Sequence, residues 1–182
     1  MIKRVRPKVV LHSMNWPQFL QPGGKDSDEI VGGPQCCRSS YRDNCDYQRP
    51  KDIPALIKQL QADLTELTSL GIKVFVATLN PECKQFEPNH MLSGDDVGDI
   101  RPVYKSKFRQ EHKELIDLVE TAVAAANATL IDYADNYCWE DVCQVVDHYG
   151  RPIFKDSDHL TSTFVYRYLS VVDQVIDAAM AD

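Results

Sequence analysis

Short apolar segments alternate with amphipathic helical segments along most of this chain. Three segments are apolar almost throughout and rich in β-branched residues, as strands covered on both faces are: Lys8–Ser13, Lys73–Leu79 and Ala128–Tyr133. Helical periodicity follows each of them, at about 52–70, 103–127 and 162–179. Gly71 provides a stop signal for the first helix. This order predicts an α/β fold, with a parallel sheet in sequence order and helices on both faces.

Bulk composition narrows the classes of function. The 182 residues, 43% hydrophobic and 26% charged, suffice for one domain with a sizeable core. The net charge of −7 argues against nucleic acid as a partner, because phosphate binding requires a basic surface. No apolar run approaches the roughly 18 residues of a membrane span, so we expect no direct membrane insertion. The basic N-terminus leads into only a short apolar run and does not resemble a signal peptide.

Six cysteines indicate an oxidising compartment. Cys138 and Cys143 flank Trp-Glu-Asp-Val in a polar loop, and close pairs of this kind usually form a disulfide. Zinc is the rival interpretation, but the chain has no Cys-x-x-Cys pair and no histidine at ligand spacing, so we expect no metal. The sequence leaves the pairing of the other four cysteines open: Cys36, Cys37, Cys45 and Cys83. Three of these lie in an irregular loop at 17–50, and a second irregular segment covers 81–102.

A carboxylate precedes a histidine by three residues near the C-terminus, in Asp156-Ser-Asp-His159. A histidine beside a fixed carboxylate keeps one tautomer and can take a proton from a hydroxyl group. The segment opens the last predicted helix, at the sheet edge where sites form in α/β proteins. His159 is therefore the candidate general base and Asp156 its orienting partner. The alternative is a helix cap, with Asp158 and Thr161 or Ser162 accepting from free backbone N–H groups.

Asn15 and Trp16 follow the first predicted strand. The Asn15 amide is a candidate donor to an oxyanion, and the alternative is a turn residue before Pro17. Trp16 either walls a pocket or covers the end of the sheet. We expect His159 to lie near Asn15, because a catalytic site requires these groups to converge.

The nucleophile is the weak point of this interpretation. The sequence contains no Gly-Asp-Ser segment. Ser27 and Ser157 are the serines in Asp-Ser contexts. Ser27 lies in a charged loop without a strand before it, and Ser157 is too close in sequence to face its own base well. We therefore expect the part of the domain that carries the serine to be missing from this chain.

Several segments together resemble a known family. They are Asp-x-x-His before a final helix, the short Cys138–Cys143 loop, Leu70-Gly-Ile-Lys-Val-Phe-Val-Ala with Asn-Pro-x-Cys after it, and Gly150-Arg-Pro-Ile-Phe-Lys-Asp. The chain resembles the C-terminal SGNH domain of membrane acyltransferase-3 proteins, which are bacterial polysaccharide O-acetyltransferases. The resemblance runs from about Lys8 to Ala179, and the last block is the most specific.

The resemblance implies a three-layer α/β/α sandwich of flavodoxin-like SGNH hydrolase type, N-terminally truncated, with residues 1–182 as one partial domain. It implies a Ser-Asp-His acyl-transfer site facing the periplasm, with His159 as base, Asp156 as triad acid and Asn15 or Trp16 on the oxyanion side. It further implies an acyl ester and a carbohydrate acceptor as substrates, no cofactor, and an acyltransferase-3 membrane domain in the parent protein.

We therefore expect an esterase or O-acetyltransferase domain whose activity alone is doubtful, because the serine block is missing. One rival hypothesis is a non-catalytic remnant that binds glycan or protein with the same fold. Another is a cysteine-rich interaction module built on the loop at 17–50.

Overall fold

The computed structural model describes residues 2–20, 35–36, 46–47, 52–93, 96–98 and 100–181. The chain divides into two compact units. We call Met1–Leu79, Lys113–Leu130 and Ala178–Asp182 the sheet unit, and Asn80–His112 with Ile131–Asp177 the hairpin unit. Ser27 and the pairing of Cys36, Cys37 and Cys45 lie outside what the structure describes.

The main sheet has the predicted strand order. Its strands are β1 (Val9–His12), β4 (Lys73–Ala77) and β8 (Thr129–Ile131), in that order across the sheet. β1 pairs with β4 in parallel, with Val10 opposite Val74 and His12 opposite Val76. Every residue of β4 after Lys73 is buried, as expected for a strand covered on both faces. The prediction of an α/β fold with a parallel sheet is confirmed.

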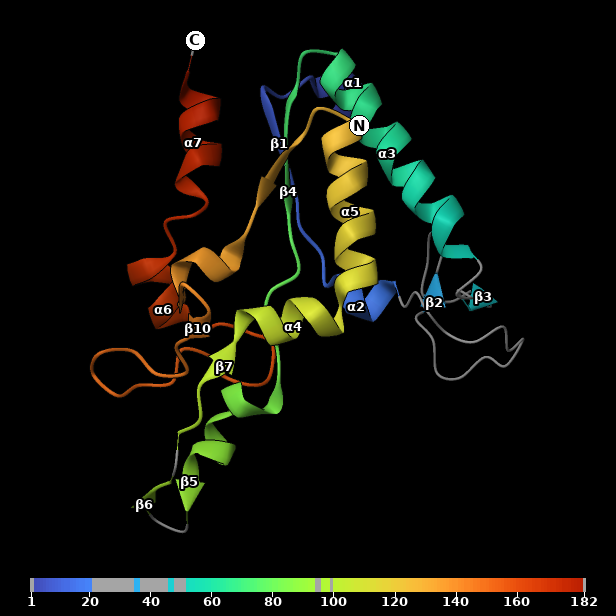
Figure 1. The fold of residues 1–182 in the computed structure, drawn as a ribbon. Helices are drawn as coiled ribbons and strands as arrows, with labels where there is room; N and C mark the ends of the chain where they lie inside the picture. Colours follow the sequence, from blue (N-terminus) through green and yellow to red (C-terminus); the bar gives the residue numbers. More distant parts are fainter. Residues whose placement is uncertain are drawn as a thin grey trace. The chain divides into compact units, whose positions relative to one another are not determined.

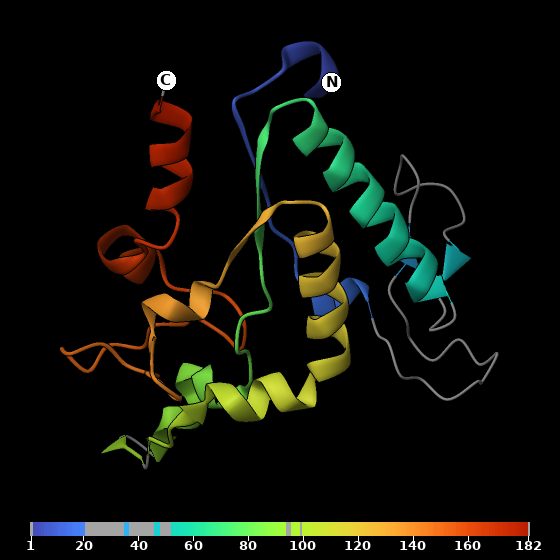
Figure 2. The same cartoon turned by 45° about the horizontal axis from the view of Figure 1, so that its top comes forward.

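Two long helices cover this sheet. α3 (Ile53–Ser69) and α5 (Lys113–Ala125) lie side by side next to β1 and β4 (Figures 1 and 2). Leu64 of α3 and Val119 of α5 are buried on their apolar faces. Gly71 follows α3 with φ of +79°, a conformation that glycine adopts without steric cost, so the predicted stop signal is confirmed.

Shorter elements complete the sheet unit. They are α1 (Ile2–Val5), α2 (Trp16–Phe19) and the antiparallel pair β2 (Gln35–Cys36) and β3 (Asp46–Tyr47). Two lysines also bind the end of the chain: Lys73 Nζ donates to Ala178 O at 3.3 Å, and Lys8 Nζ to Ala181 O at 3.2 Å. These contacts place cations at carbonyls near the end of the last helix, where they are favourable.

The hairpin unit consists of short elements around an aromatic core. Its 3-10 helices are η2 (Lys84–Phe86), η3 (Pro88–Met91) and η4 (Tyr133–Asn136), and its strands are β5 (Leu92–Ser93), β6 (Asp96–Val97), β7 (Val103–Tyr104), β9 (Cys138–Trp139) and β10 (Val142–Cys143). The strands β7, β10 and β9 form one antiparallel sheet, and β5 pairs with β6. The core includes Phe86 stacked on Phe154 at 4.2 Å between ring centroids, with Tyr137 edge-on to both.

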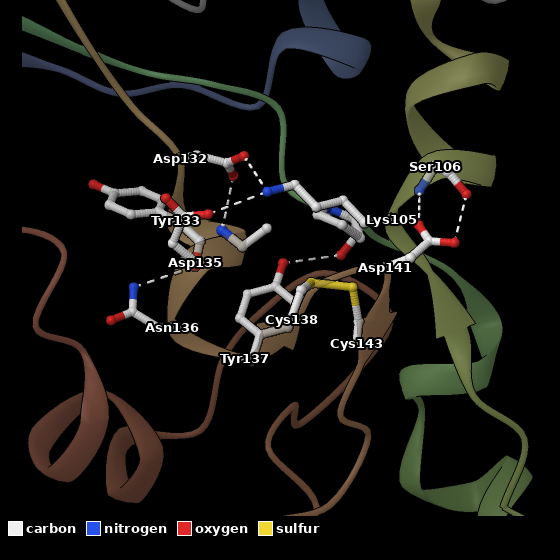
Figure 3. The surroundings of a disulfide bond; sticks show 12 residues. Lys105, Ser106, Asp132, Tyr133, Asp135, Asn136, Tyr137, Cys138, Asp141 and Cys143 are labelled. Atoms are coloured by element: carbon white, nitrogen blue, oxygen red, sulfur yellow. Dashed lines mark hydrogen bonds and ion pairs between the residues drawn. A yellow bond between two sulfur atoms is a disulfide. The ribbon is translucent and has the colours of Figure 1, made fainter.

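The predicted disulfide is present. Cys138 and Cys143 lie opposite each other on β9 and β10, with Cα atoms 3.8 Å apart, and their sulfur atoms are bonded (Figure 3). Tyr137 beside them donates its buried hydroxyl to Pro81 O at 3.3 Å. Lys105 binds Asp132 at 2.7 Å and Asp135 at 3.1 Å in the same region. This covalent and polar network fixes the hairpin.

The predicted helix at 103–127 is wrong in its extent. Val103 and Tyr104 form β7, and the helix is divided at His112 into α4 (Lys105–Glu111) and α5. Only polar side chains separate Phe108, the last buried residue of α4, from Leu115, the first of α5. This stretch therefore has no buried apolar side chain whose packing would stabilise one continuous helix.

The predicted helix at 162–179 is also divided, into α6 (Ser162–Tyr168) and α7 (Asp173–Met180). Between them, the side-chain oxygen of Asn136 accepts from the backbone N–H groups of Ser170 at 2.8 Å and Val171 at 3.1 Å. This long-range competition for backbone donors ends α6. The expected apolar stripe on α7 is not buried, since Ile176 is exposed. None of the helices among the described residues has the length and apolarity that crossing a membrane requires.

Candidate active site

A closed loop carries the predicted base. Ile153 O accepts from Thr161 N–H at 2.8 Å, and His159 O accepts from Lys155 N–H at 2.9 Å. An antiparallel bridge between Phe154 and Leu160 lies between these bonds. Since Ile153 and Phe154 are fully buried in the aromatic core, the loop has a rigid base. We call residues 155–159 the base loop.

Asp156 organises the base loop. Its Oδ1 accepts from the backbone N–H of His159 at 2.7 Å and of Asp158 at 3.2 Å. Both of its carboxylate oxygens lie 3.0 Å from Nδ1 of His159. One carboxylate therefore fixes the backbone of the loop and the imidazole ring that the loop presents, and the predicted contact of Asp156 with His159 is confirmed.

The charge of Asp156 fixes the tautomer of the ring. Partial burial acts to raise the pKa of the carboxyl group, but hydrogen bonds from His159 N–H, Asp158 N–H and the imidazole outweigh it and lower the pKa to about 2. An ionised carboxylate only accepts hydrogen bonds, so Nδ1 must be the protonated nitrogen. Nε2 is then the nitrogen available to accept a proton. The ring is 61% exposed, so a substrate can reach it.

The helix-cap alternative is confirmed for Thr161 and not for Asp158. Thr161 is the N-cap of α6, and its hydroxyl accepts from Phe164 N–H at 3.3 Å. Asp158 instead lies 3.2 Å from Nδ1 of His159 and accepts from the Ser157 hydroxyl at 3.3 Å. The carboxylates of the base loop are therefore directed at the imidazole and the loop itself.

Two residues not predicted as site residues lie against the base loop. Cys83 N–H donates to Ser157 O at 3.1 Å, which ties the segment after β4 to the tip of the loop. Burial raises the pKa of the neighbouring Glu82 carboxyl, and the charge of Asp158 raises it further while that of His159 lowers it. The Asn-Pro-x-Cys segment forms part of the family resemblance, but nothing in its spacing indicates that it lies beside the base loop.

A cavity of about 400 Å³ borders these residues within the hairpin unit. It is lined by residues from the segment after β4, from β7 and from α4: Glu82, Cys83, Gln85, Arg101, Pro102, Val103, Tyr104, Lys107, Phe108 and Glu111. Phe108 and Val103 are buried, while charged side chains supply the polar part of the lining. A few polar groups in a largely apolar cavity are typical of small-molecule sites.

Asn15 and Trp16 belong to the sheet unit. Trp16 is 1% exposed and donates its indole N–H to Ala77 O at 2.8 Å, so it covers the carboxyl ends of β1 and β4. Its ring lies 5.5 Å from that of His12. The approach of His159 to Asn15, and the roles assigned to Asn15 and Trp16, stay predictions.

The base loop also offers donors for a cation. Asp156, Asp158 and His159 each offer one ligand atom, and these three atoms lie within 4.8 Å of one another. Exposed acidic groups of this kind are common, and Nδ1 and both carboxylates already take part in the hydrogen bonds described above. A cation bound through Nδ1 would displace the proton that fixes the tautomer.

Comparisons with known proteins concern the family and the fold of the chain. Residues 2–174 match the family described as SGNH domain (fused to AT3 domains). Among curated proteins, none matches the chain. A similar solved structure is the periplasmic domain of a lipopolysaccharide acetyltransferase from Salmonella ser. Paratyphi A, with a TM-score of 0.54 and 17% identity. The match covers 96% of this chain and 59% of that one, so this chain spans about three-fifths of its length. Because the family match extends over nearly the whole sequence, the chain belongs to the family of SGNH domains fused to AT3 domains.

Proposed function

We propose that this chain carries the general base and the orienting carboxylate of a serine acyl-transfer site that acts on cell-surface polysaccharide. The observation that carries the proposal is the contact of Asp156 with Nδ1 of His159, at 3.0 Å from both carboxylate oxygens. This geometry leaves Nε2 free to act and the ring exposed, as a base needs.

In the first half-reaction, a serine hydroxyl attacks the carbonyl carbon of an acyl ester while Nε2 of His159 takes the hydroxyl proton. Asp156 stabilises the imidazolium that forms and remains ionised itself. Backbone N–H groups and the Asn15 amide hold the oxyanion. When the tetrahedral intermediate collapses, His159 returns the proton to the leaving alkoxide, and the acyl group stays on the serine.

In the second half-reaction, a sugar hydroxyl attacks the acyl-serine. His159 takes the proton of that hydroxyl, and the collapse of the second intermediate returns the proton to the serine. The products are the acylated sugar and the free serine. Water in place of the sugar makes the same site an esterase.

The serine lies on a segment outside the 182 residues in this proposal, because the sequence holds no Gly-Asp-Ser. Within the described residues, β1 is the edge strand of its sheet, with β4 on its other side. An edge strand presents unpaired backbone donors and acceptors, so a serine-bearing strand has a place to pair there. The family description, SGNH domains fused to AT3 domains, favours a membrane acyltransferase-3 domain as partner and a location at the periplasmic face of the inner membrane.

A fluorophosphonate probe followed by peptide mass spectrometry tests the proposal, because it labels serines that a neighbouring base activates. The 182-residue chain alone is expected to carry no label and to hydrolyse acetyl esters weakly or not at all. The chain joined to a Gly-Asp-Ser segment is expected to carry the label on that serine, and His159→Ala is expected to remove it.

Label on Ser27 or Ser157 of the 182-residue chain would contradict this assignment of the nucleophile. Labelling of the joined chain that persists in His159→Ala would remove the role of His159, and the non-catalytic remnant would then be the better hypothesis. Tyr166→Ala is the matched control, since this exposed aromatic on α6 lies outside the base loop.

A further inference from the structure

An exposed apolar row crosses the small antiparallel sheet of the hairpin unit. Val142 of β10 lies directly opposite Tyr104 of β7 on one side and Trp139 of β9 on the other. Directly opposite residues of antiparallel strands project from the same face of a sheet. Tyr104, Val142 and Trp139 are 46%, 44% and 80% exposed. We call these three side chains the aromatic row.

The opposite face of this sheet is anchored in the core. Val103 and Cys143 are buried there, and the disulfide joins Cys143 to Cys138 on the same face (Figure 3). Alternation therefore fixes the aromatic row outward on a covalently closed hairpin. Two aromatic rings exposed to water on a rigid surface do not contribute the hydrophobic stabilisation that their burial would give. Exposed apolar patches of this kind mark binding sites.

The aromatic row is continuous with the cavity beside the base loop. Tyr104 lines that cavity together with Glu82 and Cys83. Cys83 in turn binds Ser157 O at the tip of the base loop. A chain-like ligand lying on Trp139 and Tyr104 would thus extend into the cavity next to the loop that carries His159.

The charges of the cavity define the chemistry of that ligand. Its lining carries the cations Arg101 and Lys107 and the carboxylates Glu82 and Glu111, so neither sign prevails. An uncharged ligand with many hydroxyl groups can bind to both kinds of group. The three strands, about 4.8 Å apart, spread the row over about 10 Å, a length that suits consecutive sugar rings. The C–H face of a sugar ring packs on an aromatic ring. Neither a nucleotide phosphate nor an acidic peptide requires such an aromatic surface for binding.

We propose that the aromatic row binds an uncharged carbohydrate chain, with sugar rings stacked on Trp139 and Tyr104 and the next sugar in the cavity beside Glu82. The inference rests on the proposed function, since it assigns the binding surface of the acyl acceptor. It commits to a glycan rather than to a protein partner or a second copy of the chain.

The indole N–H signals of the wild-type protein test this inference by NMR, because Trp16 and Trp139 are the two tryptophans of the chain. Cellohexaose and chitohexaose serve as uncharged probes and a hyaluronan hexasaccharide as the anionic comparison. We expect either uncharged probe to shift the Trp139 signal and to leave that of buried Trp16 in place. By calorimetry, Trp139→Ala should weaken this binding about tenfold.

Tyr166→Ala is the matched control, because Tyr166 is 91% exposed on α6 and lies outside the row, and its binding should equal that of wild type. No Trp139 shift with either uncharged probe overturns the inference, as does stronger binding of hyaluronan. Equal weakening in Tyr166→Ala also overturns it. Self-association that Trp139→Ala abolishes, without a sugar-induced shift, would assign the row to a dimer instead.

The two proposals fail separately. Trp139→Ala should keep the fluorophosphonate label of the joined chain and lose oligosaccharide binding. His159→Ala should lose the label and keep the binding. Absence of the label alone would remove the proposed function, and absence of binding alone would remove the carbohydrate surface.

Discussion

The sheet unit and the hairpin unit achieve order by different means. The sheet unit buries continuous apolar strands such as Val74–Ala77 under two long helices. The hairpin unit has strands of two residues, which cannot stabilise themselves. It relies instead on stacked aromatic rings, a disulfide, and side chains that bind backbone groups, as Asn136 and Asp156 do.

The difference shows where precision for chemistry comes from in this molecule. The base loop belongs to the unit with little regular structure, yet it begins directly after Ile153 and Phe154 in the core. Its other end is tied to these two residues by the Phe154–Leu160 bridge and the hydrogen bond from Thr161 N–H to Ile153 O. The contact of Asp156 with His159 is thus held by packing and by hydrogen bonds to the loop backbone. Loops positioned by a rigid scaffold commonly carry function.

The largest expected effect concerns the base. In the chain joined to a Gly-Asp-Ser segment, His159→Ala should lower kcat for p-nitrophenyl acetate by about 10⁴- to 10⁶-fold. Removal of a triad member leaves only the catalysis that the oxyanion donors and substrate binding supply. Steady-state kinetics measures this loss. Asp156→Asn should cost about 10⁴-fold, since the neutral amide no longer fixes the tautomer.

Tyr166→Ala is the control and should leave kcat unchanged. A loss under tenfold in His159→Ala would show that the hairpin unit does not supply the base.

The second effect concerns the aromatic core of the hairpin unit. Phe86 is fully buried against Phe154, so Phe86→Ala should lower the free energy of unfolding by about 3–5 kcal/mol. Urea denaturation measures the loss, and hydrogen exchange locates it. If the units are independently stabilised, exchange should accelerate at Ile153 more than at Val76 of β4.

Equal acceleration at both residues would show that the chain unfolds as one cooperative body, so that the sheet unit and the hairpin unit are not stabilised independently. Tyr166→Ala again serves as the matched aromatic control, with an expected change under about 0.5 kcal/mol.

The third effect concerns the disulfide. The bond closes a loop with a sequence separation of 5 residues. By reducing the entropy of the unfolded chain, it raises the free energy of unfolding by about 2 kcal/mol. The double variant Cys138→Ala and Cys143→Ala should lose that amount in urea denaturation, with the larger disturbance in the hairpin unit.

Cys83→Ala is the matched control, because the structure describes Cys83 as a free thiol. A double variant as stable as wild type would mean that the aromatic core alone holds the hairpin.

The smallest effect is a dependence on pH. The folded-state pKa of Asp156 is about 2, below its ordinary value of 3.8. The carboxylate therefore stabilises the folded state fully above about pH 4, and this contribution is lost as the pH falls from 3.8 through 2. Carboxyl ¹³C shifts of Asp156 should report a midpoint near 2.

In Asp156→Asn, the corresponding part of the stability change between pH 4 and 2 should disappear. A midpoint at the ordinary value of 3.8 would show that the base loop does not hold the carboxylate as described.

Sequence patterns predicted the sheet unit well and the hairpin unit in part. Buried strands and α3 carry strong periodicity, so their positions followed from the residues themselves. The hairpin strands are too short to show a period. The local pattern places Val103 in a helix, because its pairing with Cys143 is a contact between residues distant in the sequence. The break before α7 depends on Asn136, a residue 34 positions before Ser170 in the chain.

The candidate site divides in the same way. Asp156 and His159 could be predicted as a pair, because three residues of separation suffice for their contact. The approach of Cys83 to Ser157 depends on the fold, and spacing alone did not indicate it.

The free thiol of Cys83 has a consequence for the folding of a disulfide protein. Burial raises the pKa of this thiol, so few thiolates exist at neutral pH. Exchange with a disulfide proceeds through the thiolate, which makes Cys83 a poor attacker of the bond between Cys138 and Cys143. Once the hairpin has closed, its covalent pairing is protected kinetically from the one thiol that the structure describes as free.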